Sequence, residues 1–426
     1  MPVSFNATQA FIVRLRESLD RLRAAERLAP QPAAPSRPPR SSRTPDRAGV
    51  GRTWDHLVAE TAATDADRAQ LADPATLDTL DAYARNIENM IGTVKVPVGL
   101  AGPLRVNGLY ASGDYLVPLA TTEAALVASY GRGSRAVTLA GGAVAALINE
   151  GMLRSPGFAF ASIYEAGMFA IWCVDAFADL KAAAEATTRH GKLIEVAPQM
   201  EGDNVFLLCR YTTGDAAGQN MATIATEALC RHAVAHAPVQ PRHWFVEANL
   251  SGDKKASALA ALGGRGRSAT ATVLLPERLV AGVLRTTPER MQDYGRMAAI
   301  GGVLSGTLGV QAHVANGLAA LYLATGQDVA CVAESAGSVT RMEMRGPDLF
   351  CSVTLPSMVL GTVGGGTGLP SQSASLNILG LAGPGKAAAL AEVAAALCLA
   401  GEISIIAALS AGQFTDAHRN LARGRA

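Results

Sequence analysis

The stretch "PLATTEAALVASYGRGSRA", residues 118–136, sets a single carboxylate, Glu123, among small and apolar residues. The residues that follow it have the composition of a buried helix, and the Thr122 hydroxyl could cap a helix that begins there. Glu123 is then either a first-turn acid favoured by the helix dipole, which is the commoner case, or an acid kept protonated by burial. Only the second alternative makes it a proton donor.

The composition is that of a globular protein with a sizeable core. The 426 residues are enough for two or three domains, and 49% of them are hydrophobic. A formal net charge of +1 gives no electrostatic reason to expect nucleic acid or an anionic membrane. Neither is therefore expected as a partner.

Cysteines and histidines lack the spacing of metal ligands. The six cysteines form no CxxC pair and the seven histidines no HExxH motif, so we expect buried thiols of a reducing compartment and no metal. The most apolar run, residues 393–412, is interrupted by Glu402, and the amino terminus lacks a signal core. A soluble, cytoplasmic protein is expected.

Periodicity and turn residues divide the chain. Helical spacing of leucines predicts an amphipathic helix within residues 1–28, and the Pro-, Ser- and Arg-rich residues 30–52 are predicted to be a disordered linker. Residues 156–249 alternate strand-like and helical segments, which is typical of an α+β unit. Residues 278–302 are predicted as one long helix.

Two glycine-containing segments could face a ligand. The loop "GTVGGGTGLP", residues 361–370, can bring backbone N–H groups close to a phosphate or carboxylate, or it is a flexible turn. It is no Walker A loop, because no Lys-Ser/Thr follows. In "YTTGDAAGQNMATIATEA", residues 211–228, Asp215 either caps the next helix or lies where the helix amino terminus faces a polar cofactor.

Charged residues in three other segments are either solvent-exposed residues without a role in catalysis or catalytic residues. In "SGDKK", residues 251–255, the lysines are either solvated or placed to stabilise an oxyanion and to anchor a substrate carboxylate. Asp328 follows an apolar helix, where the dipole disfavours an acid, and this mismatch hints at function. His418 lies in a polar carboxy-terminal tail and is either idle or able to deliver a proton.

Taken in order, these stretches resemble 3-hydroxy-3-methylglutaryl-coenzyme A (HMG-CoA) reductases across residues 85–420. The matching segments are "ENMIGTVKVPVGLAGPL", "PLATTEAALVAS", "RGSRA", "EGDNVF", "TGDAAGQNM", "SGDKK", "GRGRS", "HVAN", "GQD", "LPSMVLGTVGGGTGLP" and "LAGEISIIAALSAG". The TTE and DKK forms resemble the class I branch, which implies NADPH rather than NADH as the cofactor.

The resemblance assigns roles residue by residue. It implies four catalytic residues: Glu123, Lys254, Asp328 and His418. It implies six substrate-binding residues: Arg154, Ser251, Asp253, Lys255, Arg296 and Asn316. It implies cofactor contacts from Asp215, Gly218, Asn220, Met221, Gly364, Gly365, Gly366 and Thr367, and no metal. Two methionines of the family's cofactor loop are replaced by Ala217 and Gln219, and a family lysine by Arg296.

The family also implies an architecture and a reaction. A helical part at 53–105 would precede a large α/β domain, 106–155 and 250–426, with a ferredoxin-like NADP-binding domain inserted at 156–249. Active sites would lie between the subunits of a homodimer or higher even-numbered oligomer. The reaction implied is the four-electron reduction of (S)-HMG-CoA to (R)-mevalonate and CoA, through mevaldyl-CoA and mevaldehyde. Asp328 is expected between Glu123 and Lys254. The alternatives are a reductase of another acyl-CoA thioester and a non-catalytic homologue.

Overall fold

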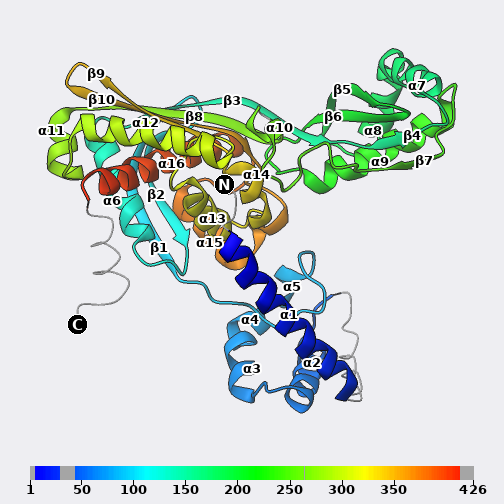
Figure 1. The fold of residues 1–426 in the computed structure, drawn as a ribbon, viewed down its shortest axis with the longest axis horizontal. Helices are drawn as coiled ribbons and strands as arrows, with labels where there is room; N and C mark the ends of the chain where they lie inside the picture. The colour runs from blue at the N-terminus through cyan, green and yellow to red at the C-terminus, as the bar shows by residue number, and fades with distance from the viewer. Residues whose placement is uncertain (1–4, 29–43, 263, 413–426) are drawn as a thin grey trace. The chain divides into compact units, whose positions relative to one another are not determined.

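The computed structural model describes residues 5–28, 44–262 and 264–412 (Figure 1). The chain divides between Val94 and Lys95 into two compact units. His418 lies outside the described residues.

The first unit is helical. Its helices are α1 (Phe5–Leu28), α2 (Arg47–Glu60), α3 (Asp65–Leu71), α4 (Pro74–Asp78) and α5 (Leu80–Tyr83). The helix predicted within residues 1–28 is present as α1, and its amphipathic role stays a prediction. The linker prediction is wrong at its carboxyl end, because α2 begins at Arg47: the Asp46 side chain accepts a hydrogen bond from Gly49 N at 2.7 Å and caps it. Trp54 anchors the small core by donating from Nε1 to the Ile91 carbonyl at 2.7 Å.

One mixed sheet runs through the second unit. Its larger part holds β1 (Val98–Gly108), β2 (Ser112–Ala120), β3 (Ala143–Arg154), β8 (Gly266–Leu275), β9 (Val339–Arg345) and β10 (Asp348–Met358). Its smaller part holds β4 (Gly157–Ala159), β5 (Lys192–Glu201), β6 (Asn204–Thr212) and β7 (His243–Phe245). β3 joins the two parts: its first two-thirds pair with β8, and Met152–Arg154 pair with β6 (Figure 1). The β1–β3 pairing is parallel and the others are antiparallel.

Helices cover both parts of the sheet. Beside the smaller part lie α7 (Ile163–Asp175), α8 (Phe177–Glu185) and α9 (Gln219–His236). Beside the larger part lie α6 (Leu126–Leu139), α12 (Pro288–Ser305), α13 (Val314–Thr325) and α16 (Ala387–Ser410). The shorter helices are α10 (Ala258–Ala261), α11 (Glu277–Leu279), η1 (Val280–Leu284), η2 (Val329–Cys331), α14 (Val332–Ser335), η3 (Gly365–Gly368) and α15 (Pro370–Leu379). The α+β class is confirmed, whereas the domain boundaries stay predictions.

The single long helix predicted over residues 278–302 is interrupted. Arg285 adopts a left-handed conformation, with φ 59°, and a new helix, α12, starts at Pro288. Proline has no N–H to donate and is tolerated only in the first turn of a helix, so α12 cannot continue the preceding turn.

α16 is the central helix of the core. It is long and apolar enough to cross a membrane, but 89% of its most apolar window is buried inside the protein. Two buried glutamates fix the chain around it. Glu392 accepts hydrogen bonds from the backbone N–H groups of Tyr110 and Ala111, both at 2.8 Å. Glu402 accepts from the Ala312 N–H at 3.0 Å, and so stabilises the amino terminus of α13.

Close packing of α6 on α16 depends on Gly133. A methyl group at this position would overlap the Ala400 carbonyl oxygen. We expect Gly133→Ala to lower the free energy of unfolding, measured by urea denaturation, by about 1–3 kcal/mol. Gly131→Ala is the control in the same helix, because its methyl group meets no atom within 4 Å. Equal stability of the two variants would contradict the packing.

Candidate active site

Glu123 lies in a loop and is exposed. α6 begins at Leu126, three residues after it, and its amino terminus has no side-chain cap. Ala125 precedes the helix with φ 69°, a left-handed conformation that prevents the helix from extending back to Thr122. The predictions that Thr122 caps the helix and that the helix buries Glu123 are therefore wrong.

Asn316 holds the Glu123 carboxylate. Its side-chain nitrogen donates to both oxygens of Glu123, at 3.1 and 2.9 Å. Asn316 belongs to the first turn of α13, whose start is fixed by Glu402 from the buried α16. A predicted catalytic residue and a predicted substrate-binding residue thus meet on a rigid helix end.

Lys254 and Asp328 form an ion pair at the opposite end of α13. The Lys254 ammonium lies 2.9 Å from Asp328 Oδ2. The hydrogen bond to Asp328 raises the pKa of Lys254. Partial burial opposes ionisation of Asp328, but Lys254, together with hydrogen bonds from the Ala330 N–H and Gln219, lowers the pKa of that carboxyl overall. The pair therefore stays charged over a wide pH range.

The turn that carries Asp328 also holds the glycine loop. The preceding residue, Gln327, donates to the Gly361 carbonyl at 3.0 Å and accepts from the Gly361 N–H at 2.8 Å. The Thr362 N–H donates to the Asp215 carbonyl at 2.8 Å. Both predicted cofactor loops and the predicted catalytic Asp328 are therefore brought together by hydrogen bonds between distant parts of the chain.

Asp215 caps a different helix from the one next to it in sequence. Its carboxylate accepts from Gly385 N at 2.7 Å and from Ala387 N at 3.1 Å, at the start of α16. Partial burial disfavours the charge, yet these hydrogen bonds lower the pKa of Asp215 overall. The expected cap on α9 is wrong: that helix starts after Gly218 with no side-chain cap, which leaves its first N–H groups for a ligand.

The remaining predicted cofactor residues lie around this opening. Gly364 and Gly365 are exposed and have positive φ values of 72° and 55°. The buried Thr367 hydroxyl donates to the Gly364 carbonyl at 2.7 Å and shapes the loop. Asn220 is exposed and Met221 is half-buried in the first turn of α9, while Gly366 is half-buried against the Gly326 backbone.

Four predicted substrate residues cluster near Lys254. Arg154, at the end of β3, is buried and its guanidinium donates to Asp253 Oδ2 at 2.7 Å. Ser251 is buried, and its Oγ accepts from the Asp253 N–H at 3.3 Å. The exposed Lys255 donates to the Asp253 carbonyl at 2.8 Å. Lys254 itself has φ 56°, a strained conformation typical of functional sites.

A buried ion pair beneath Lys254 was not identified as functional from the sequence. Arg265 Nε lies 3.0 Å from Glu334 Oε2, and both side chains are almost fully buried. Arg265 Nη1 is 2.9 Å from Asp253 Oδ1. Burial raises the pKa of Glu334, and Arg265 opposes that shift. Arg265 falls in the matched "GRGRS" segment, whereas no sequence signal marked Glu334.

The predicted site residues do not all meet within one chain. Glu123 and Asn316 lie at the start of α13, and the Lys254–Asp328 pair lies beyond its end. From Asn316 to Thr325 the helix rises roughly 14 Å at 1.5 Å per residue. The expectation that Asp328 lies between Glu123 and Lys254 is therefore wrong for a single chain.

Arg296 also lies apart from the other substrate residues. It is exposed on α12 and pairs with Asp293, one turn earlier, at 3.5 Å. In the described part of the chain no group of three or more His, Cys, Asp or Glu side chains could hold a metal ion. The six cysteines are buried free thiols.

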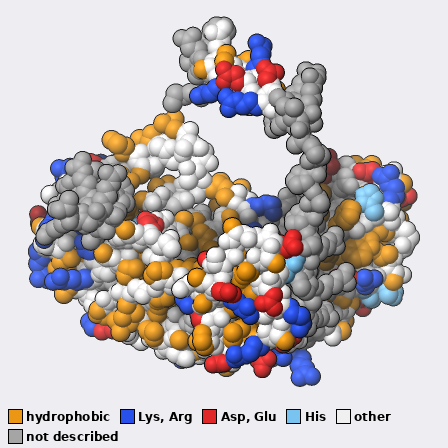
Figure 2. All heavy atoms as spheres, turned by 90° about the horizontal axis from the view of Figure 1, so that it is seen from below, with side chains coloured by type: hydrophobic (Ala, Val, Ile, Leu, Met, Phe, Trp, Pro, Cys, Tyr) orange, Lys and Arg blue, Asp and Glu red, His pale blue; other side chains and the backbone are white. Residues whose placement is uncertain are grey.

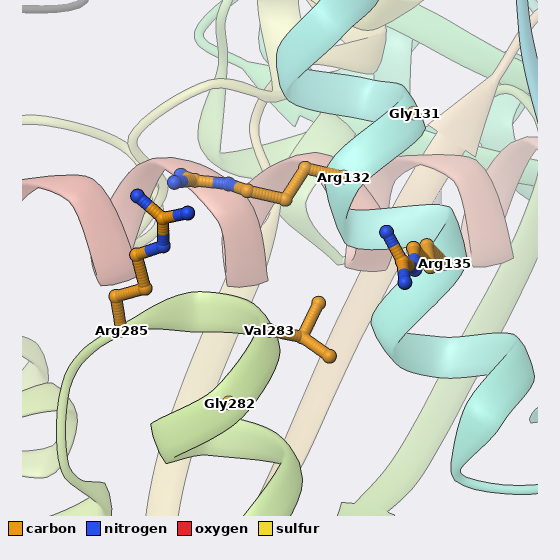
Figure 3. Close-up of a pocket in the computed structure, with 6 residues that line it drawn as sticks. All are labelled: Gly131, Arg132, Arg135, Gly282, Val283 and Arg285. Atoms are coloured by element: carbon orange, nitrogen blue, oxygen red, sulfur yellow. The ribbon is translucent and has the colours of Figure 1, made fainter.

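A basic pocket of about 490 Å³ lies between α6 and the turn before α12. Its polar lining consists of Arg132, Arg135 and Arg285, and Figure 3 shows Arg132 and Arg285 pointing toward one another. Burial, and then the charge of Arg285, lowers the pKa of Arg132. Since no acid among the described residues lines this pocket, it is suited to an anion. Sequence reasoning missed it, although "RGSRA" contains two of the three arginines, Arg132 and Arg135.

Comparisons with known proteins agree with these motifs. The hydroxymethylglutaryl-coenzyme A reductase family model matches residues 54–423. The 3-hydroxy-3-methylglutaryl-coenzyme A reductase of Aeropyrum pernix is 45% identical over 354 residues, covering 82% of this chain and 84% of the relative. The reductase of Haloferax volcanii is 47% identical over 343 residues, covering 79% and 85%.

Among solved structures, the class II reductase of Streptococcus pneumoniae bound to NADPH has the same fold. Its TM-score is 0.63 at 20% identity, and the match covers 84% of this chain and 96% of that one. The ordered motifs, the fold and the extent of these matches lead to one assignment. The chain belongs to the hydroxymethylglutaryl-coenzyme A reductase family.

Proposed function

We propose that this protein reduces (S)-HMG-CoA to (R)-mevalonate and CoA with NADPH, as an enzyme of the mevalonate pathway. The observation that carries the proposal is the 2.9 Å Lys254–Asp328 pair, which lies on the turn that also fixes the glycine loop. An ammonium that stays charged over a wide pH range is thereby placed next to two loops suited to an anionic cofactor.

The residues around the glycine loop fit NADPH. The uncapped start of α9 offers N–H groups, and the exposed Gly364 and Gly365 leave room for close approach of a phosphate. When bound, NADPH supplies the hydrides. Asn220 and Met221, in the first turn of α9, are the side chains proposed to line the same cradle.

Lys254 is proposed to stabilise the oxyanion that forms when the thioester carbonyl is reduced. One positioned donor can be worth about 3–4 kcal/mol in such a step. The hemithioacetal then loses CoA thiolate to give the aldehyde. A second reduction yields an alkoxide, to which Glu123 is proposed to deliver the proton. The role of His418 in protonating the thiolate stays a prediction.

Two features support an active site completed by a second subunit. The two halves of the predicted site lie at opposite ends of α13, so one chain cannot bring Glu123 to Lys254. α12 exposes an apolar stripe with exposed fractions of 64–83%: Met297, Ile300, Val303 and Leu304. Apolar side chains also reach the surface on the face in Figure 2. A contiguous apolar patch is typical of a protein interface.

We therefore propose a homodimer, or a higher even-numbered oligomer, with sites between subunits. Glu123 of one chain would meet Lys254 and Asp328 of the other. The second subunit would then bury the Glu123 carboxyl, which α6 of its own chain leaves exposed. Arg296 lies on the apolar face of α12 and would reach substrate across the same boundary. The burial of α16 favours a soluble enzyme, and a cytoplasmic location stays a prediction.

The basic pocket is proposed to bind the phosphates of CoA. We expect Arg285→Ala to raise KM for HMG-CoA about 10-fold or more, because a hydrogen bond to a charged group is worth about 1.5–3 kcal/mol. The expected change in kcat is smaller. Arg290→Ala, on the first turn of α12 and outside this pocket, is the matched control. An unchanged KM in Arg285→Ala would exclude the pocket as the phosphate site.

A steady-state assay with purified HMG-CoA and each coenzyme tests the function. NADPH oxidation that depends on HMG-CoA and yields mevalonate is expected. Oxidation with another acyl-CoA thioester but not with HMG-CoA would refute the assignment. The same assay shows whether NADPH or NADH is the coenzyme. The class I form predicted from TTE and DKK is not supported by the comparisons, because the solved structure that matches is that of a class II reductase.

A further inference from the structure

Gln219 occupies a fixed position beside the catalytic pair. It is the first residue of α9, and its carbonyl accepts hydrogen bonds from the Thr223 hydroxyl at 2.9 Å and from Arg154 Nη2 at 3.4 Å. The preceding Gly218 has φ 77° and packs so closely on Thr213 that a methyl group there would overlap it. The backbone from which the Gln219 side chain projects is therefore rigid.

The side-chain amide of Gln219 joins two charged groups. Its nitrogen donates to Asp328 Oδ2 at 3.3 Å, and its oxygen accepts from Arg265 Nη2 at 3.3 Å. A guanidinium can only donate and an ionised carboxylate can only accept, so one orientation of the amide satisfies both partners. Gln219 thus connects the exposed Asp328 to a buried cation.

Arg265 is a firm anchor for this connection. Its guanidinium is held by Glu334 at 3.0 Å and by Asp253 at 2.9 Å, away from solvent. Glu334 Oε1 also accepts from the Lys254 N–H at 3.3 Å. The backbone and the ammonium of Lys254 are therefore both tied to one closed network, which runs through Glu334, Arg265, Gln219 and Asp328.

We propose that Gln219 is a positioning residue, which fixes the Asp328 carboxylate against Lys254 by tying it to the buried Arg265–Glu334 pair. The proposal rests on the reductase function proposed above, because it assigns Gln219 a part in the same step. Without the amide, Asp328 keeps Lys254 as a partner but loses the link that restrains its rotamer. The strained Lys254 is then less well oriented toward the carbonyl oxygen.

The first test is Gln219→Met, which keeps length and volume but removes both polar ends. We expect kcat to fall about 10-fold, KM to change by less than about 2-fold, and the acid limb of kcat/KM to move to higher pH. The acid limb moves to higher pH because the amide favours the charged carboxylate of Asp328. Without the amide, the pKa of Asp328 rises. Gln372→Met, a first-turn glutamine of α15, is the matched control.

The second test is a double-mutant cycle with Asp328→Asn. If Gln219 acts through Asp328, Gln219→Met lowers kcat no further in that background. A full additional loss, or an unchanged kcat and acid limb in Gln219→Met alone, would overturn the proposal.

A substrate-free measurement separates this proposal from the proposed function. The pH dependence of Lys254 amine labelling, followed by mass spectrometry, needs no turnover. A lower midpoint in Gln219→Met than in the unmodified protein supports the positioning role even if HMG-CoA is not reduced. Identical midpoints would contradict it even if HMG-CoA is reduced.

Discussion

Lys254→Gln is expected to lower kcat for HMG-CoA reduction by a factor of about 10²–10³, the usual loss when one oxyanion donor is removed. Glutamine is one atom shorter than lysine and keeps part of its hydrogen bonding, but it cannot supply a positive charge. The ammonium is in place before substrate arrives, because Asp328 holds it at 2.9 Å. The loss should therefore appear in kcat rather than in KM for HMG-CoA.

The control for this prediction is Lys181→Gln, an exposed lysine on α8 that pairs with Glu185 at 3.8 Å. It should leave both kinetic constants unchanged, because an exposed pair of this kind contributes little. A Lys254→Gln enzyme with more than about a tenth of the normal kcat would rule out Lys254 as the main oxyanion donor.

Asp328 should control the alkaline limb of the pH profile. Its hydrogen bond raises the pKa of Lys254, so the ammonium persists to higher pH than an isolated lysine would. In Asp328→Asn that contribution is lost, and the alkaline limb of kcat/KM should move to lower pH. Rate measurements across the alkaline range check this directly. A limb that stays in place would mean that another group titrates there.

Glu123→Gln is expected to abolish the reduction of mevaldehyde, with a loss of about 10²–10⁴ in kcat. Glutamine can still accept the Asn316 hydrogen bond, which is 2.9 Å long in the unmodified protein, so the loop should be retained. What disappears is the acidic proton that the final alkoxide requires. Loss of aldehyde reduction with an unchanged melting temperature is the expected result.

The control for Glu123 is Glu277→Gln, at the exposed start of α11 and away from α13. Normal mevaldehyde reduction by Glu123→Gln would refute the proton-donor role. Loss of aldehyde reduction in both variants would instead indicate a general effect of removing a carboxylate.

Much of the second half of the site could be predicted from sequence, because its residues fall in short motifs, "SGDKK", "GQD" and the glycine loop, whose residue types already indicate function. The motif that contains Asp328 also contains Gln327, whose amide holds the glycine loop at Gly361. The dipole mismatch at Asp328 pointed to function, and the ion pair with Lys254 agrees with that interpretation. The interruption of the apolar run by Glu402 likewise marked a real buried acid.

Other features depended on contacts that local patterns do not encode. Glu123 lies outside its helix because Ala125 takes a left-handed conformation that an alanine rarely adopts. Asp215 caps α16, which begins 172 residues later, instead of the adjacent α9. The Arg265–Glu334 pair joins β8's leading loop to α14, and only the tertiary fold brings these two side chains together.

Gln219 differs from the methionine of the family, and only the structure shows which residues it contacts. By sequence alone it marked only a replaced methionine in the family's cofactor loop. In the fold its amide contacts Asp328 and Arg265, which makes it part of the charged network around Lys254.

Activity of a mixed dimer tests most directly whether the site is shared between subunits. One Lys254→Gln chain and one Glu123→Gln chain, carrying different tags, are co-expressed and purified through both tags. A site built from two chains leaves one of the two sites intact, so about half of the normal kcat per dimer should return although each parent variant is inactive. Activity no higher than that of the parents would contradict a site shared between subunits.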